Sequence, residues 1–195
     1  AFIEAVESNP SAAFTAPQLL QFVYGQPIGT HGYAYTNTDY ILAQMVIEAA
    51  TRHSFAGELT SRILRPLGLH HTCLAPQTYP PSTAARMATG YFLGDCTSPL
   101  AGAAVPALAL SWAQGAGGII ATLPDLAIWD RALYRGRLLP PRQQRELETL
   151  ISTTTSKPIR RTTLDDPLGY GLGIAQVTSP PTGTVWFYEG ETFGY

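Results

Sequence analysis

The residue types best suited to acid–base chemistry meet in the short run Tyr35-Thr36-Asn37, which stands directly before an amphipathic segment. Side chains two positions apart in extended backbone point to the same side, so the phenol and the amide can enter one cleft. The positive end of a following helix favours the anionic phenol, which is the form that accepts a proton. Taken alone, the run is more often a core tyrosine followed by an asparagine helix cap, so its meaning depends on the rest of the chain.

Other groupings of reactive residues are weaker signals of a site. His70, His71 and Cys73 are close together, but no second cluster with zinc-type spacing accompanies them, so we expect no metal site. Residues 115–118 are not followed by the Gly-Lys-Ser/Thr of a phosphate-binding loop. The glycines of residues 169–173 are expected in a strand, where they allow close backbone packing. We therefore expect no cofactor.

Helices are expected to position the Tyr35-Thr36-Asn37 run. The clearest helical pattern takes Asn37 or Thr38 as its N-cap and has Asp39 in its first turn, where a carboxylate suits the helix dipole. A shorter helix, capped by Thr15, precedes it. The apolar face of the main helix is expected to contain Ile41, Leu42, Met45, Val46 and Ala49.

Three more helices are expected further along the chain. Ser54 opens one that Pro66 should end, because proline cannot continue the backbone hydrogen bonding. Thr122 caps the next. The last helix is expected to follow two prolines and to extend as far as the apolar residues Leu150 and Ile151.

The Pro-rich region 76–106 is expected to form long loops with one short strand at residues 87–93. Cys73 and Cys96 flank much of this region. Two such cysteines suit a disulfide in an exported protein and two free thiols equally well, so the sequence leaves both states open.

Strands follow the helices. Residues 170–177 and 184–188 are rich in β-branched and aromatic side chains, and the turn residues 179–183 between them indicate an antiparallel hairpin. The order predicts an α+β fold, with a mainly helical region at residues 1–166 and the start of a sheet at residues 167–195. Both regions are expected to belong to one larger catalytic domain.

The composition excludes two classes of partner. The chain has 12 basic and 14 acidic residues in 195, a formal net charge of −2, and no concentrated basic surface for nucleic acid. Its apolar segments are interrupted by polar residues, so we expect no membrane span. The first residues do not have the charged and apolar regions of a signal peptide.

Five motifs along nearly the whole chain resemble those of the serine β-lactamase and penicillin-binding-protein superfamily. The resemblance is to the branch of class C β-lactamases, D-Ala-D-Ala carboxypeptidases and related esterases. Each motif is loose, but five in the family's order are specific. They are Tyr35-Thr36-Asn37 with Tyr40 (Y-S-N-x-x-Y in the family), Pro66-Leu67-Gly68-Leu69 with Thr72 (P-L-G-M-x-x-T), residues 115–126 (G-x-G-G-x-x-S-T-x-x-D-L), Tyr170-Gly171-Leu172-Gly173 (Y-G-x-G-W) and residues 190–195 (H-x-G-x-T-P-G-F).

The resemblance implies a β-lactamase/transpeptidase-like fold and a serine hydrolase that forms an acyl-enzyme on a small-molecule or peptide substrate. It implies that Tyr35 relays protons to and from the nucleophile, and that Asn37 donates to the substrate carbonyl and the catalytic lysine. The run Tyr188-Glu189-Gly190 would lie on the strand at the edge of the cleft. The N–H of Glu191 would supply half of an oxyanion hole.

The family's nucleophile motif, S-x-x-K, is absent from this sequence. Lys157 is the only lysine, and the residue three positions before it is Thr154. We therefore expect the chain to be a fragment, incomplete at both ends and inactive alone, whose serine and lysine belong to a missing N-terminal part of the same enzyme. The resemblance favours a periplasmic or secreted location.

The expected substrate also departs from the family pattern. Tyr188 occupies the position where relatives place Lys or His, and Glu189 and Glu191 follow it. A neutral phenol beside carboxylates attracts an anionic substrate less well than an ammonium group does. We therefore expect neutral ester-like or amide substrates to be favoured over β-lactams or D-Ala-D-Ala termini. The alternatives are a non-catalytic module that binds peptidoglycan-like peptides and a degenerate member of the family.

Overall fold

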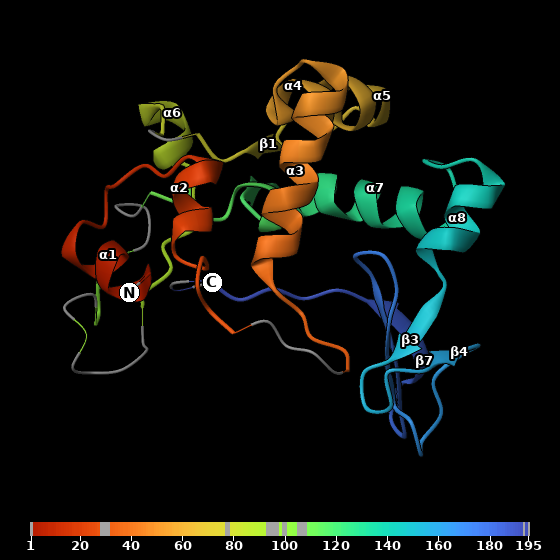
Figure 1. The fold of residues 1–195 in the computed structure, drawn as a ribbon. Helices are drawn as coiled ribbons and strands as arrows, with labels where there is room; N and C mark the ends of the chain where they lie inside the picture. Colours follow the sequence, from red (N-terminus) through yellow and green to blue (C-terminus); the bar gives the residue numbers. More distant parts are fainter. Residues whose placement is uncertain are drawn as a thin grey trace.

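The computed structural model describes residues 2–27, 32–76, 79–92, 98, 101–104, 109–192 and 194. Helices occupy one part of the molecule and an antiparallel sheet lies beside them (Figure 1), which confirms the expected α+β class. The helices are α1 (Phe2–Ser8), α2 (Ala16–Gln21), α3 (Asn37–Thr51), α4 (Phe55–Leu59), α5 (Arg65–Leu67), α6 (Pro81–Ala84), α7 (Leu123–Tyr134) and α8 (Pro141–Leu147), with a π-helical turn η1 (Thr60–Leu64) and a 3-10 turn η3 (Gln114–Ala116).

The main sheet contains five antiparallel strands in the order β4-β3-β5-β6-β7. β6 and β7 form the expected hairpin, in a register that runs from Ala175 opposite Phe187 to Ser179 opposite Gly183. The single strand expected at residues 170–177 is in fact two, because the chain leaves the sheet between β5 and β6. The strands are β3 (Leu150–Ser152), β4 (Pro158–Ile159), β5 (Leu168–Tyr170), β6 (Ala175–Ser179) and β7 (Gly183–Phe187).

The last helix ends earlier than its apolar pattern predicted. α8 stops at Leu147, and Leu150 and Ile151 belong to strand β3. Leu150 is 1% exposed, and Ile151 pairs with Tyr170 of β5. Leu150 lies opposite Ile159 of β4, so pairing with β4 and β5 decides the conformation of these two residues. Because β3 and β4 precede residue 167, the sheet draws on both of the expected regions, and a division at residue 166 stays a prediction.

Gly171 lies where two backbone segments meet closely. A side-chain carbon at this position would collide with the carbonyl oxygen of Leu147, at the end of α8. The N–H of Leu172 donates to the same carbonyl oxygen at 3.0 Å. The expectation that glycines in residues 169–173 allow close backbone packing is thus confirmed at this position.

Helix α3 begins one residue earlier than expected. Its N-cap is Thr36, whose Oγ1 accepts a hydrogen bond from the N–H of Thr38 at 3.0 Å. Neither Asn37 nor Thr38 is the cap, so the side chain of Asn37 is not needed to satisfy the helix end. The exact cap matters for the site, as shown below.

The buried face of α3 also differs from the expected stripe. Ile41 and Gln44 are buried, and Met45 packs against the cluster formed by Ala16, Leu20 and Ile41. Leu42 and Val46 are exposed, at 44% and 67%, so placing them on the core face was wrong. The polar Gln44 takes the buried position because it bonds to the η3 segment, as described below.

The helix that Ser54 caps continues past Pro66. The Oγ of Ser54 accepts from the N–H of Gly57. The chain then runs through α4, η1 and α5 and ends at Gly68, whose φ of 67° is left-handed. The wider π-helical turn comes directly before Pro66, and π-turns of this kind are a known way to accommodate a local disturbance in a helix. The expected end at Pro66 is therefore wrong by two residues.

Among the described residues of the region 76–106 are a short helix, α6, and an isolated antiparallel bridge between Tyr91 and Ala104. The strand expected at residues 87–93 is not seen in its described part, residues 87–92, where Tyr91 forms only the bridge, and residue 93 lies outside the described residues. An unexpected pair of short strands, β1 (Cys73–Leu74) and β2 (Ile119–Ile120), lies beside this region. Cys73 is a free, exposed cysteine. Cys96 lies outside the described residues.

Asp125 connects helix α7 to the segment before β1. Thr122 caps α7 as expected, with its Oγ1 accepting from the N–H of Asp125. The Asp125 carboxylate is 5% exposed, and its Oδ2 accepts from the N–H of His71 at 2.8 Å and the hydroxyl of Thr72 at 2.9 Å. These bonds fix the start of α7 relative to β1.

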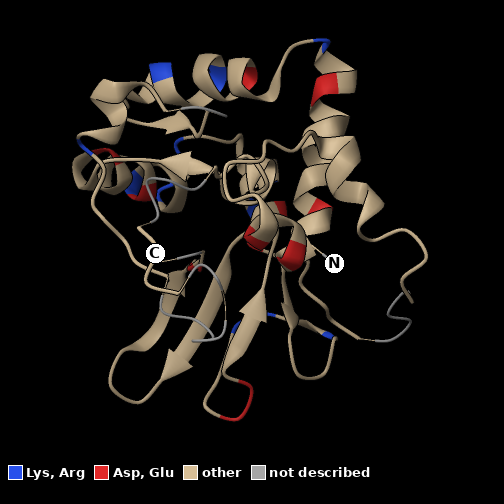
Figure 2. Cartoon of the chain, turned by 90° about the vertical axis from the view of Figure 1, so that its left-hand side faces the viewer, with Lys and Arg blue, Asp and Glu red and all other residues tan. Residues whose placement is uncertain are grey.

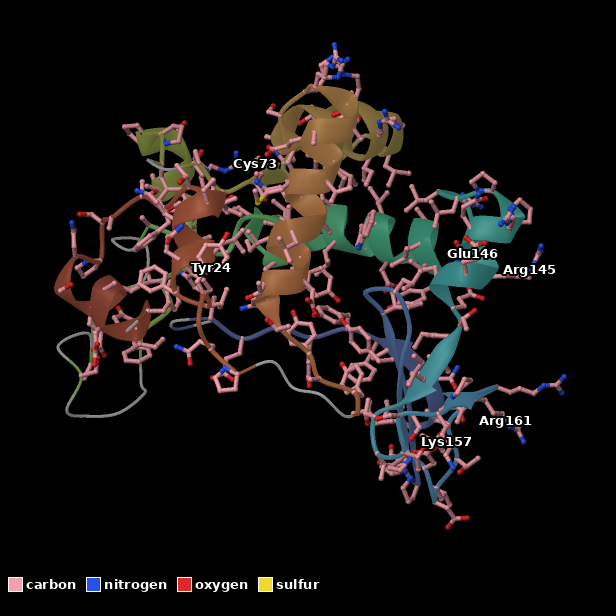
Figure 3. The ribbon with its side chains drawn as sticks, in the orientation of Figure 1. Tyr24, Cys73, Arg145, Glu146, Lys157 and Arg161 are labelled. Carbon is pink, nitrogen blue, oxygen red and sulfur yellow. The ribbon has the colours of Figure 1, made fainter. Side chains whose placement is uncertain are left out.

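Charged side chains occur in small separate groups on the ribbon (Figure 2). Arg145 and Glu146 on α8, and Lys157 and Arg161 near the sheet, point outward from the body of the molecule (Figure 3). In the described part of the chain, no helix combines the length and apolar character needed to cross a membrane.

Candidate active site

The structure brings the side chains of Tyr35 and Asn37 together. The Tyr35 hydroxyl donates a hydrogen bond to Oδ1 of Asn37 at 3.2 Å. This contact is available because Thr36, rather than Asn37, caps helix α3. The side chain of Asn37 therefore accepts a hydrogen bond from the phenol and does not cap the helix. This argues against the interpretation of the run as a core tyrosine followed by an asparagine helix cap.

Tyr188 completes a chain of three polar groups. Its hydroxyl donates to the Tyr35 hydroxyl at 2.8 Å, across 153 positions in sequence. Strand β7 ends at Phe187, so the run Tyr188-Glu189-Gly190 lies just past the strand and not on it, which corrects the expectation. In Figure 1 the chain leaves β7 and runs past the N-terminal end of α3. This path delivers Tyr188 to Tyr35.

Three more tyrosines surround this chain of hydroxyls, and sequence reasoning did not assign them to the site. The Tyr40 and Tyr170 hydroxyls form a short hydrogen bond with each other. The ring centroids of Tyr40 and Tyr170 lie 5.6 Å and 6.0 Å from that of Tyr35, and the ring of Tyr33 lies 5.4 Å from Tyr170. Two features of the sequence could have indicated these tyrosines: the spacing of aromatic residues around Asn37, and the tyrosine that starts the Tyr170-Gly171-Leu172-Gly173 motif. We call Tyr33, Tyr35, Tyr40, Tyr170 and Tyr188 the tyrosine cluster.

The cluster holds Tyr35 in its neutral form. Burial raises the pKa of the Tyr35 phenol, and its hydrogen bond with Tyr188 and its electrostatic interactions with Tyr188 and Asp39 raise the pKa further. The expectation that the helix dipole favours the phenolate is therefore wrong for this structure, because burial and like charges outweigh the dipole. Here Tyr35 is a hydroxyl donor.

The remaining predicted residues lie in the exposed segment that follows Tyr188. Glu189, Gly190 and Glu191 are all exposed, and a side-chain carbon built on Gly190 would meet no atom within 4 Å. The segment therefore has open space at Gly190. The tyrosine cluster itself is accessible, since Tyr35 is 43% and Tyr188 47% exposed.

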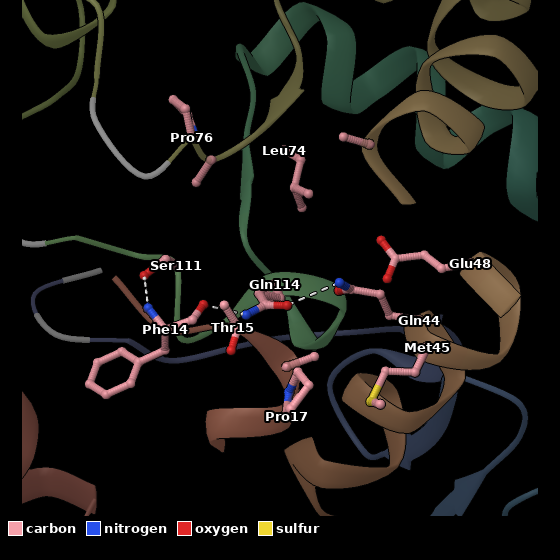
Figure 4. A pocket seen from close by; sticks show the side chains of 13 residues that line it. Phe14, Thr15, Pro17, Gln44, Met45, Glu48, Leu74, Pro76, Ser111 and Gln114 are labelled. Atoms are coloured by element: carbon pink, nitrogen blue, oxygen red, sulfur yellow. Dashed lines mark hydrogen bonds between the residues drawn. The ribbon is translucent and has the colours of Figure 1, made fainter. Parts of the chain in front are cut away.

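A cavity of about 620 Å³ lies away from the cluster, between α2, α3 and η3 (Figure 4). The polar side chains along it bond to one another and to backbone. Gln44 Nε2 donates to Gln114 Oε1 at 3.0 Å, and Gln114 Nε2 donates to the carbonyl of Phe14 at 2.8 Å. The N–H of Gly115 donates to Gln44 Oε1 at 2.8 Å. This network ties α3 to the segment before α2 and explains why Gln44 is buried.

A second cavity, of about 710 Å³, contains His70, His71 and Cys73 on its wall and is bordered by Thr192 near the C-terminal end. Burial raises the pKa of the Cys73 thiol, which disfavours the reactive thiolate. The described residues contain no group of three or more His, Cys, Asp or Glu side chains that could hold a metal ion.

The family model for Beta-lactamase matches residues 4–195, which is nearly the whole chain. The chain belongs to the beta-lactamase family. This membership confirms the resemblance drawn from the five motifs, and it places the tyrosine cluster in a fold known from solved structures.

Similar members of this family include a D-aminopeptidase of Gluconobacter oxydans and penicillin-binding protein 4* of Bacillus subtilis. The first is 27% identical over 72% of this chain and 24% of its own length. The second is 25% identical over 84% of this chain and 36% of its own length. The chain thus spans about a quarter to a third of these relatives.

Solved structures agree on the beta-lactamase fold. A D-stereospecific amidohydrolase from a Streptomyces species superposes with a TM-score of 0.81 and 26% identity, covering 97% of this chain and 53% of that one. The D-amino acid amidase of Ochrobactrum anthropi SV3, solved with D-phenylalanine, has a TM-score of 0.63 at 24% identity, covering 92% of this chain and 59% of that one. The latter similarity supports the fold alone.

Proposed function

We propose that this chain is part of a serine hydrolase that cleaves an ester or amide through an acyl-enzyme, with Tyr35 as proton relay and Asn37 as its polar partner. The observation that carries the proposal is the hydrogen bond from Tyr188 to Tyr35 at 2.8 Å. It joins the Tyr35-Thr36-Asn37 run to the Tyr188-Glu189-Gly190 run, which are far apart in sequence, at one accessible place.

The nucleophilic serine and its lysine would come from another part of the protein, because this sequence contains no S-x-x-K. With Tyr35 already ionised, the serine hydroxyl would attack the carbonyl carbon and pass its proton to the Tyr35 oxygen, which would then give that proton to the leaving group. A lysine ammonium beside Tyr35 would lower the pKa of the phenol, since a nearby positive charge favours the anion. That effect would oppose the burial that raises the pKa here.

The charges near the site favour substrates without a carboxylate at the position facing Tyr188. Tyr188 stands where relatives place Lys or His, and Glu189 and Glu191 are exposed directly after it. Carboxylates repel an anionic group, whereas an ester or an amide has no charge to repel. The similar proteins named as D-aminopeptidase and D-stereospecific amidohydrolase make amides a reasonable class to test first. The N–H of Glu191 stays the proposed half of the oxyanion hole.

The test compares three substrates on the protein that carries this chain: p-nitrophenyl acetate, D-alanine p-nitroanilide and nitrocefin. We expect turnover of the ester, the anilide or both, and little turnover of nitrocefin. Tyr35→Phe should lower kcat by about 10²–10⁴-fold, the usual contribution of a positioned acid–base group. The matched control is Tyr24→Phe, because Tyr24 is 65% exposed and does not belong to the tyrosine cluster. Efficient nitrocefin turnover with no esterase or amidase activity would refute the substrate class.

The competing function is a non-catalytic module that binds peptidoglycan-like peptides. The neutral state of Tyr35 favours this alternative, since a neutral phenol is not a base. A fluorescent fluorophosphonate separates the two functions, because only a protein with an activated serine becomes covalently labelled. A periplasmic or secreted location stays a prediction under either function.

A further inference from the structure

The side chain of Ser156 is bonded to the segment that leads into the candidate active site. Ser156 lies in the turn between β3 and β4, and its Oγ accepts a hydrogen bond from the backbone N–H of Tyr33 at 2.6 Å, across 123 positions in sequence. The two segments approach each other closely, because a side-chain carbon built on Gly32 would lie 3.2 Å from the same Oγ. The turn is therefore a point of attachment for the chain at Tyr33.

Tyr35 lies between this attachment and the start of helix α3. Residues 33–36 belong to no helix or strand, so they have no regular backbone hydrogen bonding of their own. Ser156 holds the segment at Tyr33, and the other end is held at Thr36, which caps α3. Two attachments within four residues leave the backbone of Tyr35 little freedom to move.

The turn holds Ser156 in a backbone conformation that few residues adopt. Its φ of 59° is left-handed, and its N–H donates to the carbonyl of Ser152 at 2.9 Å. The Oγ of Ser152 accepts from the N–H groups of Thr154 and Thr155, at 3.2 Å and 3.0 Å, and donates to Oδ1 of Asp166 at 2.8 Å. Glycine adopts the left-handed region without steric cost. What serine adds at position 156 is the hydroxyl oxygen that accepts the bond described above.

We propose that Ser156 is a positioning residue, which holds the segment before Tyr35 so that the Tyr35 hydroxyl stays within reach of its partners. This proposal rests on the proposed function, in which Tyr35 relays protons. Ser156 acts through the backbone of Tyr33. The placement of Tyr35 matters because a group that transfers protons must lie within hydrogen-bond distance of the reacting atoms, and small displacements are costly.

The experiment replaces Ser156 in the protein that carries this chain, with activity measured on the best substrate found above. Ser156→Gly and Ser156→Ala both remove the acceptor, so each should lower kcat by about 3–10-fold, the range of one net hydrogen bond. KM should not change, because the effect is on the relay. The control is Thr154→Ala, an exposed position in the same turn, which should keep the wild-type kcat.

The two substitutions differ in their effect on the fold, which separates positioning from general stability. Ser156→Ala loses the bond and keeps an unfavourable left-handed backbone, so its unfolding midpoint should fall. Ser156→Gly loses the same bond but suits the backbone, so its midpoint should stay close to that of the wild type. An equal loss of kcat at unequal midpoints supports the proposal. A loss of kcat that follows the midpoints would overturn it.

Two further measurements connect the loss to Tyr33 and Tyr35. Hydrogen exchange at the Tyr33 amide should be faster in Ser156→Gly and unchanged in Thr154→Ala, because only the first variant lacks the acceptor. In the Tyr35→Phe background, Ser156→Gly should cause no further loss of kcat, because the relay is already absent. The same fold-loss in that background, a loss that appears in KM, or unchanged exchange at Tyr33 would each contradict the positioning role.

The outcomes distinguish this proposal from the function on which it rests. If Tyr35→Phe keeps the wild-type kcat, Tyr35 is no relay, and both proposals fail. If Tyr35→Phe lowers kcat as expected while Ser156→Gly keeps the wild-type kcat, only the positioning role fails. Should Ser156→Ala not fold, as judged by circular dichroism, Ser156→Gly tests the role through kcat and amide exchange.

Discussion

Tyr170 lies at the centre of the tyrosine cluster, where its environment links protonation to stability. Burial raises the pKa of its phenol from 10.0, and hydrogen bonds and charge interactions with Tyr188 and Tyr40 raise it further. Tyr35 and Tyr33 have raised pKa values for similar reasons. The folded chain therefore keeps these protons at a pH where the unfolded chain has lost them.

The sign of the resulting pH dependence follows from linkage. Stability falls with rising pH wherever the folded state binds more protons than the unfolded state. We expect the free energy of unfolding to fall once the pH rises above about 10. The free energy of unfolding of the Tyr170→Phe variant should fall less steeply in this pH range, because the substitution removes one phenol proton that the folded state retains. Thermal melts at pH values from 8 to 11 measure this, with Tyr24→Phe as control; identical slopes for wild type and Tyr170→Phe would contradict the prediction.

Single residues were predictable where a local motif named them. Tyr35, Asn37 and Tyr188 were singled out because each belongs to a short pattern of the family, and the structure brings their side chains together, while their roles stay a prediction. The bond between Tyr40 and Tyr170 joins residues 130 positions apart, and no local pattern states which tyrosines meet. The pKa of Tyr35 was predicted in the wrong direction, because the helix dipole is visible in sequence and the surrounding rings are not.

At the scale of elements, the contact between Gly171 and α8 sets how closely the end of the helix approaches the sheet. We expect Gly171→Ala to lower the free energy of unfolding by about 1–3 kcal/mol, because the added carbon would press on the rigid backbone oxygen of Leu147. Gly190→Ala is the matched control, since the same carbon would enter open space. Urea denaturation measures both; equal stability of the two variants would show that the backbone adjusts freely.

Element boundaries were predictable where capping residues specify them, and less so where tertiary pairing decides. Thr15 and Thr122 begin their helices as predicted. The N-cap of α3 was misplaced by one residue because Thr36, Asn37 and Thr38 are all good caps. Leu150 was assigned to a helix because its apolar neighbours fit either period, and only its pairing with Ile159 of β4 distinguishes the two.

For the whole molecule, Asp125 is a central point of attachment between helix α7 and the β1 segment. Asp125→Ala would leave the N–H of His71 and the hydroxyl of Thr72 without their acceptor. We expect a loss of about 1–3 kcal/mol in the free energy of unfolding. The exposed Asp165→Ala should change stability by less than about 0.5 kcal/mol. Thermal unfolding of the two variants tests this prediction. An unchanged unfolding midpoint for Asp125→Ala would show that the hydrogen bonds of Asp125 do not stabilise the fold.

The class of fold was predictable because helices come before strands in the sequence, and family membership is now shown by the match over residues 4–195. The arrangement of the parts was not predictable. Strand order, the β1–β2 pair and the route of the chain from β7 to Tyr35 all depend on contacts between distant segments. These contacts assemble the candidate site.

Strand β7 has one more consequence. In the described part of the chain it pairs with β6 along one side only, and its other side presents backbone donors and acceptors. Its residues, Gly183–Phe187, include no charged residue and no proline, which would disfavour pairing with a further strand. An edge of this kind can pair with a strand of another molecule, so preparations of this chain should be handled as aggregation-prone.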